Sequence, residues 1–317
     1  MAGYLAIRLF SLVPVIFGVS VTVFLLLKLV PGDLAVALLG PEAGANELEE
    51  LRHQLGLDQP MIVQYWIWLQ KAVVGDLGYS LQQRIPVQEL LSARFQNTLI
   101  LTLASLAISI TLGLVAGVLS ATRPRSLLDR FVMLGALFGN SMPAFWLGIL
   151  LIVLFAVQLG WLPSGGMFSV REGPSLGGLL KHLILPSLTL GLISAGMVAR
   201  LTRSAMLESL GQDFVRTARS KGLAEYVVIW KHTLKNASLP IVTIIGTQFG
   251  FLLGGAVLTE TVFAWPGVGL LMYAAIGSRD LPVIQGGILS IAVAFTSVNL
   301  FVDIIYGFLD PRIRYGK

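Results

Sequence analysis

The segment Asp213-Phe214-Val215-Arg216-Thr217-Ala218-Arg219-Ser220-Lys221-Gly222 is the polar middle of a basic stretch, residues 200–235, between two apolar runs of membrane-spanning length. Leu210, Phe214 and Ala218 fall at helical spacing beside several cations, and Gly222 follows where a helix would end. The pattern predicts a short amphipathic helix offered to a soluble partner. The composition alone is equally compatible with an ordinary linker between two membrane spans.

The composition outside this segment is that of an integral membrane protein. Hydrophobic residues make up 55% of the chain and charged residues 12%, whereas soluble domains carry about 25% charged residues. The chain has no cysteine, which excludes disulfides and thiolate metal sites. The three histidines, His53, His182 and His232, are too scattered for a metal-binding motif. We therefore expect no metal site.

Six apolar runs could each span a bilayer, which requires about 20 residues in a helix. We expect all six to be helices, because an open sheet leaves backbone polar groups unsatisfied in lipid. The runs are Leu9–Leu27, Asn97–Ala121, Phe131–Leu159, Leu183–Ala199, Ala237–Thr259 and Leu281–Val302. The predicted fold class is all-α, a polytopic membrane protein with six transmembrane helices.

The distribution of Lys and Arg predicts the orientation of these spans. With the N-terminus in the cytoplasm, the inner segments hold 14 Lys or Arg and 6 Asp or Glu, and the outer segments hold 8 and 11. The inner segments are 1–8, 122–130, 200–236 and 303–317, and the outer ones are 28–95, 160–182 and 260–280. We therefore expect both termini in the cytoplasm, and the net charge of +5 reflects topology and not nucleic-acid binding.

The chain divides into three parts on this interpretation: an N-terminal transmembrane helix (1–30), an extracytoplasmic helical segment (31–95) and a five-helix core (96–317) with the cytoplasmic loop 200–236. The outer segment shows two apolar stripes at helical spacing. They are Leu48, Leu51 and Leu55, and then Met61, Tyr65, Trp66, Leu69 and Val73. A small helical layer on the outer membrane surface is predicted, either for partner docking or gating or for simple packing against the spans.

Glycines recur at four-residue steps in the fifth apolar run, at Gly246, Gly250 and Gly254. Such spacing lets another helix approach closely. Gln248 and Thr247 are polar neighbours at membrane depth. The pattern is explained either by packing within the chain or by a subunit interface or pore wall.

The chain lacks the motifs of several functional classes. No span carries a charge in its middle, which argues against an ion-coupled carrier. No phosphate-binding loop, His-Glu-x-x-His or Gly-x-Ser-x-Gly motif is present. Isolated hydroxyls such as Ser141 and Ser290 offer no nucleophile–base pair for an intramembrane enzyme, and a passive channel would not need an amphipathic cytoplasmic helix. We expect no catalytic site, no bound cofactor, and transport energy from another subunit.

The loop motif Arg216-Thr217-Ala218-x-x-x-Gly222 resembles the Glu-Ala-Ala-x-x-x-Gly signature of permeases in binding-protein-dependent ABC importers. Over essentially its whole length the chain resembles the dipeptide, oligopeptide and nickel branch of that family, in which the Arg-Thr-Ala form is usual. The matching segments are Val30–Asp33, Leu55–Pro60, Gly75–Ser80, Arg200–Ser204, Arg216–Gly222, Glu260–Gly267, Arg279–Val283 and Asp310–Arg314. The short outer loop 160–182 and Gly40-Pro41-Glu42-Ala43 resemble the glutathione-importer members.

The resemblance implies the type I fold of ABC importer permeases in a bacterial inner membrane. It implies three kinds of partner: a second homologous permease, two cytoplasmic ATPases that bind ATP and Mg²⁺, and an extracytoplasmic substrate-binding protein. The expected cargo is di- or oligopeptides, with glutathione, nickel chelates or another small solute as the alternative. The implied ATPase-coupling residues are Phe214, Arg216, Thr217, Ala218, Arg219, Lys221 and Gly222.

Three charged residues flank the outer ends of the fifth and sixth spans: Glu260, Arg279 and Asp280. We expect them to form a docking rim or gate at the mouth of the translocation path, or else a structural ion pair between helix ends.

Single-cysteine labelling tests the topology, because the chain contains no cysteine to remove first. We expect Ala45→Cys and Val170→Cys to react with an impermeant maleimide added outside the cell. Ser126→Cys and Gln212→Cys should react only after the inner face is exposed. Opposite labelling at two or more of these positions would overturn the orientation with the N-terminus inside.

Overall fold

The computed structural model describes residues 2–29, 34–39, 43–54, 56–169 and 173–309. The described chain is helical, with one isolated antiparallel bridge between Tyr79 and Pro86. The first helices are α1 (Ala2–Lys28), α2 (Leu34–Leu39), α3 (Ala45–Gln54), α4 (Met61–Val73), α5 (Val87–Thr122), α6 (Leu127–Ser141), α7 (Ala144–Leu151) and the π-helix η1 (Ile152–Gln158). They are followed by α8 (Leu176–Leu210), α9 (Asp213–Ser220), α10 (Glu225–Val227), the π-helix η2 (Val228–Thr233), α11 (Leu234–Val262), α12 (Val268–Ser278) and α13 (Leu281–Leu309).

Five continuous helical segments are long and apolar enough to cross a membrane: α1, α5, α8, α10 to α11, and α13. They confirm five of the six predicted spans. The third is wrong as a single helix, because α6 and α7–η1 are bent by 107° and make a sixth span only when counted together. The bend falls at Met142, whose φ of −79° and ψ of 131° are extended. Pro143 causes this, since the residue before a proline disfavours the helical conformation.

The predicted fourth span, Leu183–Ala199, is only the middle of a much longer helix. α8 has 35 residues and α5 has 36, so each is about 53 Å long at 1.5 Å per residue. A hydrocarbon core is about 30 Å thick, and both helices therefore extend well beyond it. The Ser175 hydroxyl caps the start of α8 by accepting a hydrogen bond from the Gly178 amide at 3.1 Å.

The core of the fold is the parallel contact between α5 and α8, in which Ser109 pairs with Ser194, Gly113 with Val198 and Gly117 with Thr202. A Cβ on Gly113 would lie 2.6 Å from Val198, and one on Gly117 would lie 2.6 Å from Thr202. These distances are too short for any real Cβ, so glycine is what allows the two backbones to approach. Both glycines lie in the second predicted span, where the sequence shows the same four-residue step.

The third core helix, α11, joins this pair through a buried polar cluster. The Ser109 hydroxyl of α5 donates to Ser194 of α8 at 2.9 Å. Gln248 of α11 donates to the same hydroxyl at 2.7 Å. Three helices thus satisfy their polar side chains on one another instead of facing lipid.

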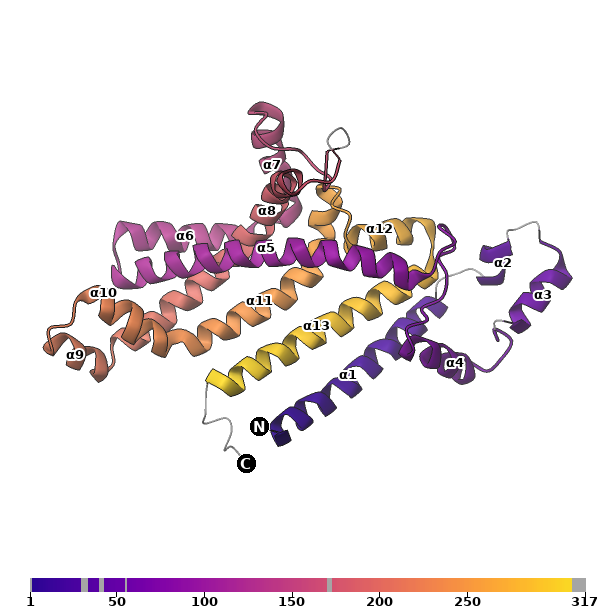
Figure 1. The fold of residues 1–317 in the computed structure, drawn as a ribbon, viewed down its shortest axis with the longest axis horizontal. Helices are drawn as coiled ribbons and strands as arrows, with labels where there is room; N and C mark the ends of the chain where they lie inside the picture. The colour runs from indigo at the N-terminus through magenta and orange to yellow at the C-terminus, as the bar shows by residue number, and fades with distance from the viewer. Residues whose placement is uncertain (1, 30–33, 40–42, 55, 170–172, 310–317) are drawn as a thin grey trace.

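Figure 1 shows α5, α11, α13 and α1 as successive rods through the middle of the molecule, with α1 farthest from α5. Arg8 of α1 and Asp303 of α13 form an ion pair at 3.2 Å, which places the start of α1 beside the end of α13. α7 projects away from the rods because of the bend at Pro143 (Figure 1).

The outer segment contains the two predicted helices as α3 and α4 and packs against α1. Tyr65 exchanges a hydrogen bond with Ser20 at 2.8 Å and packs edge-on against Phe24. Trp68 also contacts Phe24, whereas Met61, Trp66 and Val73 of the predicted stripe are exposed. The face of α4 that packs on α1 therefore includes Tyr65 and Trp68.

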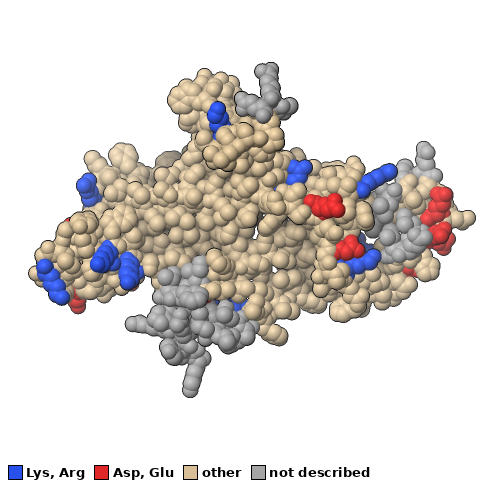
Figure 2. Space-filling model, viewed as in Figure 1, with Lys and Arg blue, Asp and Glu red and all other residues tan. Residues whose placement is uncertain are grey.

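The predicted boundary after residue 95 falls inside α5, which begins at Val87. The motif residues 30–33, 40–42, 55 and 310–314 lie outside the described residues. Figure 2 shows Lys and Arg gathered at the end of the molecule that carries α9 and α10, and Asp and Glu mainly at the opposite end around α2 to α4 and α12.

The α5–α8 contact predicts different outcomes for two Gly→Ala variants. Gly117→Ala should lower the free energy of unfolding by about 1–3 kcal/mol, because its Cβ meets Thr202 and the Ala199 carbonyl oxygen. Gly135→Ala is the matched control: nothing lies within 4 Å of its Cβ, and alanine favours a helix. Thermal unfolding in detergent measures both. Equal stabilities would show that the close approach is unimportant.

Candidate functional site

The predicted amphipathic helix is α9, and it ends at the predicted glycine. Gly222 has a φ of +73°, in the left-handed region that favours glycine. Its amide donates to the Arg219 carbonyl at 2.9 Å, and the Leu223 amide donates to the Ala218 carbonyl at 3.3 Å. This pair of bonds is a Schellman motif, which satisfies the last carbonyls of the helix.

The buried side of α9 packs against its own chain. Val215 is fully buried and Ala218 almost so, and both contact Val228 of η2, with Leu210 of α8 beside them. The stripe predicted from the sequence, Leu210, Phe214 and Ala218, includes Phe214 but not Val215. In the structure Phe214 lies outside the buried face of α9 and remains 37% exposed. The i, i+3 spacing of Val215 and Ala218 could have indicated the buried face from the sequence. Which face of α9 is covered, however, depends on the position of η2.

The cations of α9 fall into two groups. Arg219 forms a double ion pair with Glu225, Nε to Oε2 at 3.2 Å and Nη2 to Oε1 at 2.5 Å. The Glu225 carboxylate raises the pKa of Arg219. Arg216 makes one long, exposed contact with Asp213 at 3.5 Å, and Lys221 is exposed. Of the predicted coupling residues that carry an aromatic ring or a charge, Phe214, Arg216 and Lys221 are therefore exposed and without a strong ion pair in the described chain.

Two predicted coupling residues serve the helix itself. The Thr217 hydroxyl donates to the Asp213 carbonyl at 3.0 Å within the same turn. Ala218 occupies the narrow space against Val228. A bond from the Ser209 hydroxyl to the Thr233 carbonyl, at 3.2 Å, further ties the end of α8 to η2. The helix is thus held in place before any partner binds.

Glu260, predicted to lie on an outer rim, is fully buried beneath the start of α12. Its carboxylate accepts hydrogen bonds from the Thr98 hydroxyl at 2.7 Å and from the Leu270 amide at 3.1 Å. It therefore caps the positive end of α12. A Cβ on Gly267 would overlap this carboxylate, which explains the glycine at that position.

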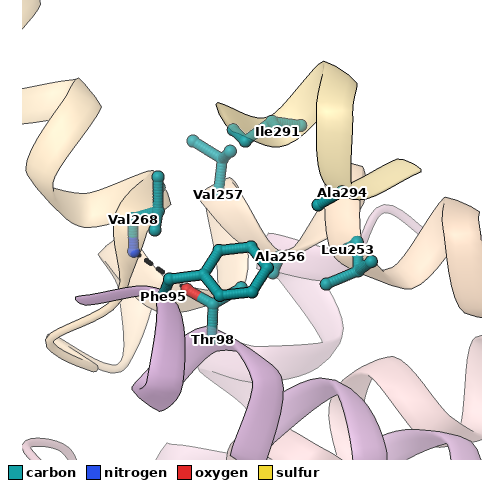
Figure 3. Close-up of a pocket in the computed structure, with 9 residues that line it drawn as sticks. Phe95, Thr98, Leu253, Ala256, Val257, Val268, Ile291 and Ala294 are labelled. Atoms are coloured by element: carbon teal, nitrogen blue, oxygen red, sulfur yellow. Dashed lines mark hydrogen bonds between the residues drawn. The ribbon is translucent and has the colours of Figure 1, made fainter. Parts of the chain in front are cut away.

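The segment around Glu260 is anchored to the start of α5. Buried Trp265 donates its indole N–H to the Asn97 carbonyl at 2.9 Å, and Asn97 donates to the Pro266 carbonyl at 2.8 Å. Thr98 accepts from the Val268 amide at 2.9 Å, as Figure 3 shows. The apolar cavity beside these residues has a volume of about 10 Å³, far too small for a peptide.

Asp280 belongs to a different network from Glu260, so the three residues do not form one side-chain cluster, and their role in docking or gating stays a prediction. Its carboxylate accepts hydrogen bonds from the Ser80 hydroxyl at 2.5 Å and from the amides of Leu81 and Gln82 at 3.1 and 3.2 Å. Arg279 has a left-handed φ of +56° and ends α12. In the described part of the chain it forms no ion pair with Glu260 or Asp280.

The glycine stripe of α11 is explained for the most part by packing within the chain. A Cβ on Gly246 would overlap Val302, and one on Gly250 would lie 2.7 Å from Phe295, so both glycines face α13. Gln248 faces Ser194 of α8. Nothing lies within 4 Å of a Cβ on Gly254, which leaves only that position of the stripe open.

Two family models together match nearly the whole chain. Residues 93–315 match the binding-protein-dependent transport system inner membrane component, and residues 1–102 match the N-terminal part of such membrane components. The chain belongs to this family, and it is a permease subunit of an ABC importer. Membership implies an ATPase and a substrate-binding protein as partners, and a multi-pass location in a bacterial inner membrane.

Relatives of similar length support this assignment. The chain is 46% identical over 315 residues to the glutathione transport system permease protein GsiC of Escherichia coli O6:H1, covering 99% of this chain and 100% of the relative. It is 45% identical, with the same coverage, to the proteins of that name from Escherichia coli K12 and Shigella dysenteriae serotype 1. The resemblance to the peptide and nickel branch is confirmed.

A solved structure of the inward-facing MetNI methionine ABC transporter shares the fold. It superposes with a TM-score of 0.57 at 21% identity, and the match covers 70% of this chain and 96% of the other. At that identity the likeness concerns the fold alone. The type I permease fold expected from the sequence is confirmed.

The buried carboxylate of Glu260 predicts a large loss of stability when it is removed. Glu260→Ala should lower the free energy of unfolding by about 2–4 kcal/mol, because the Thr98 hydroxyl and the Leu270 amide lose their acceptor. Glu89→Ala, at an exposed position in the first turn of α5, is the control and should change little. Unfolding in detergent measures both. If the unfolding midpoint of Glu260→Ala equals that of the wild type, the capping role is refuted.

Proposed function

We propose that this chain forms half of the translocation path of an ATP-driven importer, paired with a second homologous permease above two ATPases. α9 is the part of the chain that the ATPases contact. One observation supports this proposal. α9 buries Val215 and Ala218 against its own chain, and it leaves three side chains exposed: Phe214, Arg216 and Lys221. A preformed helix with an exposed aromatic residue and two cations suits a partner with an apolar cleft and acidic groups.

We place α9 and both termini in the cytoplasm. The Lys and Arg surplus of segments 1–8, 122–130, 200–236 and 303–317 supports this orientation. The pairing of Arg8 with Asp303 at the same end of the molecule agrees with an even number of crossings. ATP and Mg²⁺ are then bound by the partner ATPases, and this chain has no catalytic site and no cofactor of its own.

We further propose that the cargo is a small peptide, with glutathione as the first candidate. The relatives at 45–46% identity over the whole chain are named as glutathione transport permeases, and glutathione is itself a peptide of three residues. Other di- and oligopeptides are the alternative, because selectivity in this arrangement resides largely in the separate binding protein.

Uptake by the reconstituted complex tests the proposal. The chain, its second permease, the ATPases and the binding protein in liposomes should import labelled glutathione only when ATP is present. The isolated chain should show no ATPase turnover. Import of a dipeptide but not glutathione would select the alternative cargo, and ATP-independent flux would refute an importer.

Phe214→Ala tests the docking face of α9. Removing an aromatic side chain at the centre of an interface costs about 2 kcal/mol or more, so the affinity of the ATPases should fall at least about 30-fold and uptake should fall with it. Phe301→Ala, in α13, removes the same side chain from another exposed position and should leave ATPase binding unchanged. Equal ATPase affinity of the two variants would refute docking through Phe214.

A further inference from the structure

α6 has few buried contacts for a helix of its length. Its large apolar side chains are mostly exposed, as is typical of a surface that faces lipid or another subunit. They are Leu127, Phe131, Leu134, Leu137 and Phe138. Only two residues of α6 are buried, Asp129 and Ala136. The position of α6 therefore depends on what these two residues contact.

Asp129 is the acceptor of a buried network. Arg203 of α8 donates to both of its carboxylate oxygens, Nε to Oδ1 at 2.6 Å and Nη2 to Oδ2 at 2.8 Å. The Ser120 hydroxyl and the Arg125 amide, the latter at 2.8 Å, complete the network. The Asp129 side chain is 6% exposed. Two parallel bonds from one guanidinium fix an angle as well as a distance.

Ala136 provides the second contact with α8, through the backbone. A Cβ on Gly196 would lie 2.7 Å from the Ala136 carbonyl oxygen and 3.1 Å from its Cα. Ala136 lies two turns after Asp129, and Gly196 lies two turns before Arg203, at 3.6 residues per turn. The two helices are therefore antiparallel and in register at two points, a backbone contact at one and an ion pair at the other.

α9 is attached to the same end of α8. Arg203 lies about two turns before Leu210, and Leu210 packs with Val215 and Ala218 of α9. At its other end α6 continues through the bend at Pro143 into α7. The end of α8 thus lies between the helix that the ATPases contact and the bent α6–α7 pair.

We propose that the Arg203–Asp129 pair is the positioning contact through which movement of α9 and the end of α8 reaches α6 and the α6–α7 bend. This inference rests on the proposed function of α9. α6 also packs on the α8 backbone at Gly139, whose Cβ would lie 3.5 Å from the Leu192 carbonyl oxygen. The contacts at Gly196 and Gly139 both lie on the second half of α6. The ion pair adds a hydrogen-bonded contact at the start of α6, so α6 follows α8 as one body. A lysine at position 203 cannot make both bonds, because its ammonium is a single point charge.

Three variants of the complete importer separate positioning from simple stability. The double variant Asp129→Asn, Arg203→Met removes the pair without leaving a buried charge. Arg203→Lys keeps the charge and loses the two-bond geometry. Arg200→Met is the control: it lies one turn earlier on α8, and in the described chain its guanidinium hydrogen-bonds the Met197 sulfur, at 3.3 Å, and forms no ion pair.

The first measurement is peptide imported per ATP hydrolysed, by equal amounts of assembled complex. We expect ATP hydrolysis to persist in the double variant and in Arg203→Lys, and imported peptide per ATP to fall at least about ten-fold. The control should match the wild type. A ratio at the wild-type value in the double variant would overturn the inference. So would a parallel loss of hydrolysis and uptake, because that outcome indicates a purely structural pair.

The second measurement does not depend on the cargo. Spin labels at Leu134→Cys in α6 and Gln212→Cys before α9 occupy exposed positions in a chain without cysteine. In the otherwise wild-type complex we expect one narrow distance distribution that ATP does not change, and a broad one when Asp129→Asn, Arg203→Met is added. Identical distributions would overturn the inference. If the wild-type complex fails to import peptide, the proposed cargo is refuted, and the distances still decide whether α6 follows α9.

Discussion

The contact between α5 and α8 is the interaction on which the rest of the fold depends. Within lipid there is little hydrophobic drive between helices, so close packing and hydrogen bonds must hold them together. Gly113, Gly117 and Gly191 remove the side chains that would separate the two backbones. Once these helices are in contact, Ser194 of α8 is placed to bind both Ser109 and Gln248. α11 joins the pair there. α13 then packs against α11 at Gly246 and Gly250 of α11.

Three buried carboxylates accept hydrogen bonds from backbone amides at places where the chain leaves regular helix. Asp129 accepts from Arg125, Glu260 from Leu270, and Asp280 from Leu81 and Gln82. Irregular backbone at membrane depth is tolerated only where it is buried in protein or lines a water-filled cavity. Each carboxylate also binds a hydroxyl on another segment of the chain, at Ser120, Thr98 and Ser80 respectively. The turns are therefore fixed relative to the core.

α9 is likewise held in place by contacts within its own chain. Because Val215 and Ala218 are buried against η2, α9 forms without a partner, so the proposed docking of an ATPase on α9 costs little conformational entropy. Its attachment to the end of α8 also means that a displacement of α9 acts on a long helix of the core. A free linker would absorb that displacement.

The sequence by itself determined the membrane class, five of the six apolar spans as continuous helices and the helix that ends at Gly222, because these depend on local composition and period. The family was also readable from motifs such as Glu260–Gly267. Only the tertiary structure decided that Val215 and not Phe214 is covered, and that Glu260 and Asp280 are bound apart from Arg279. Thr98 and Glu260 are 162 positions apart, and Ser80 and Asp280 are 200 apart. A local pattern shows which face of a helix is apolar, but the partner that covers it comes from a distant segment that only folding brings near.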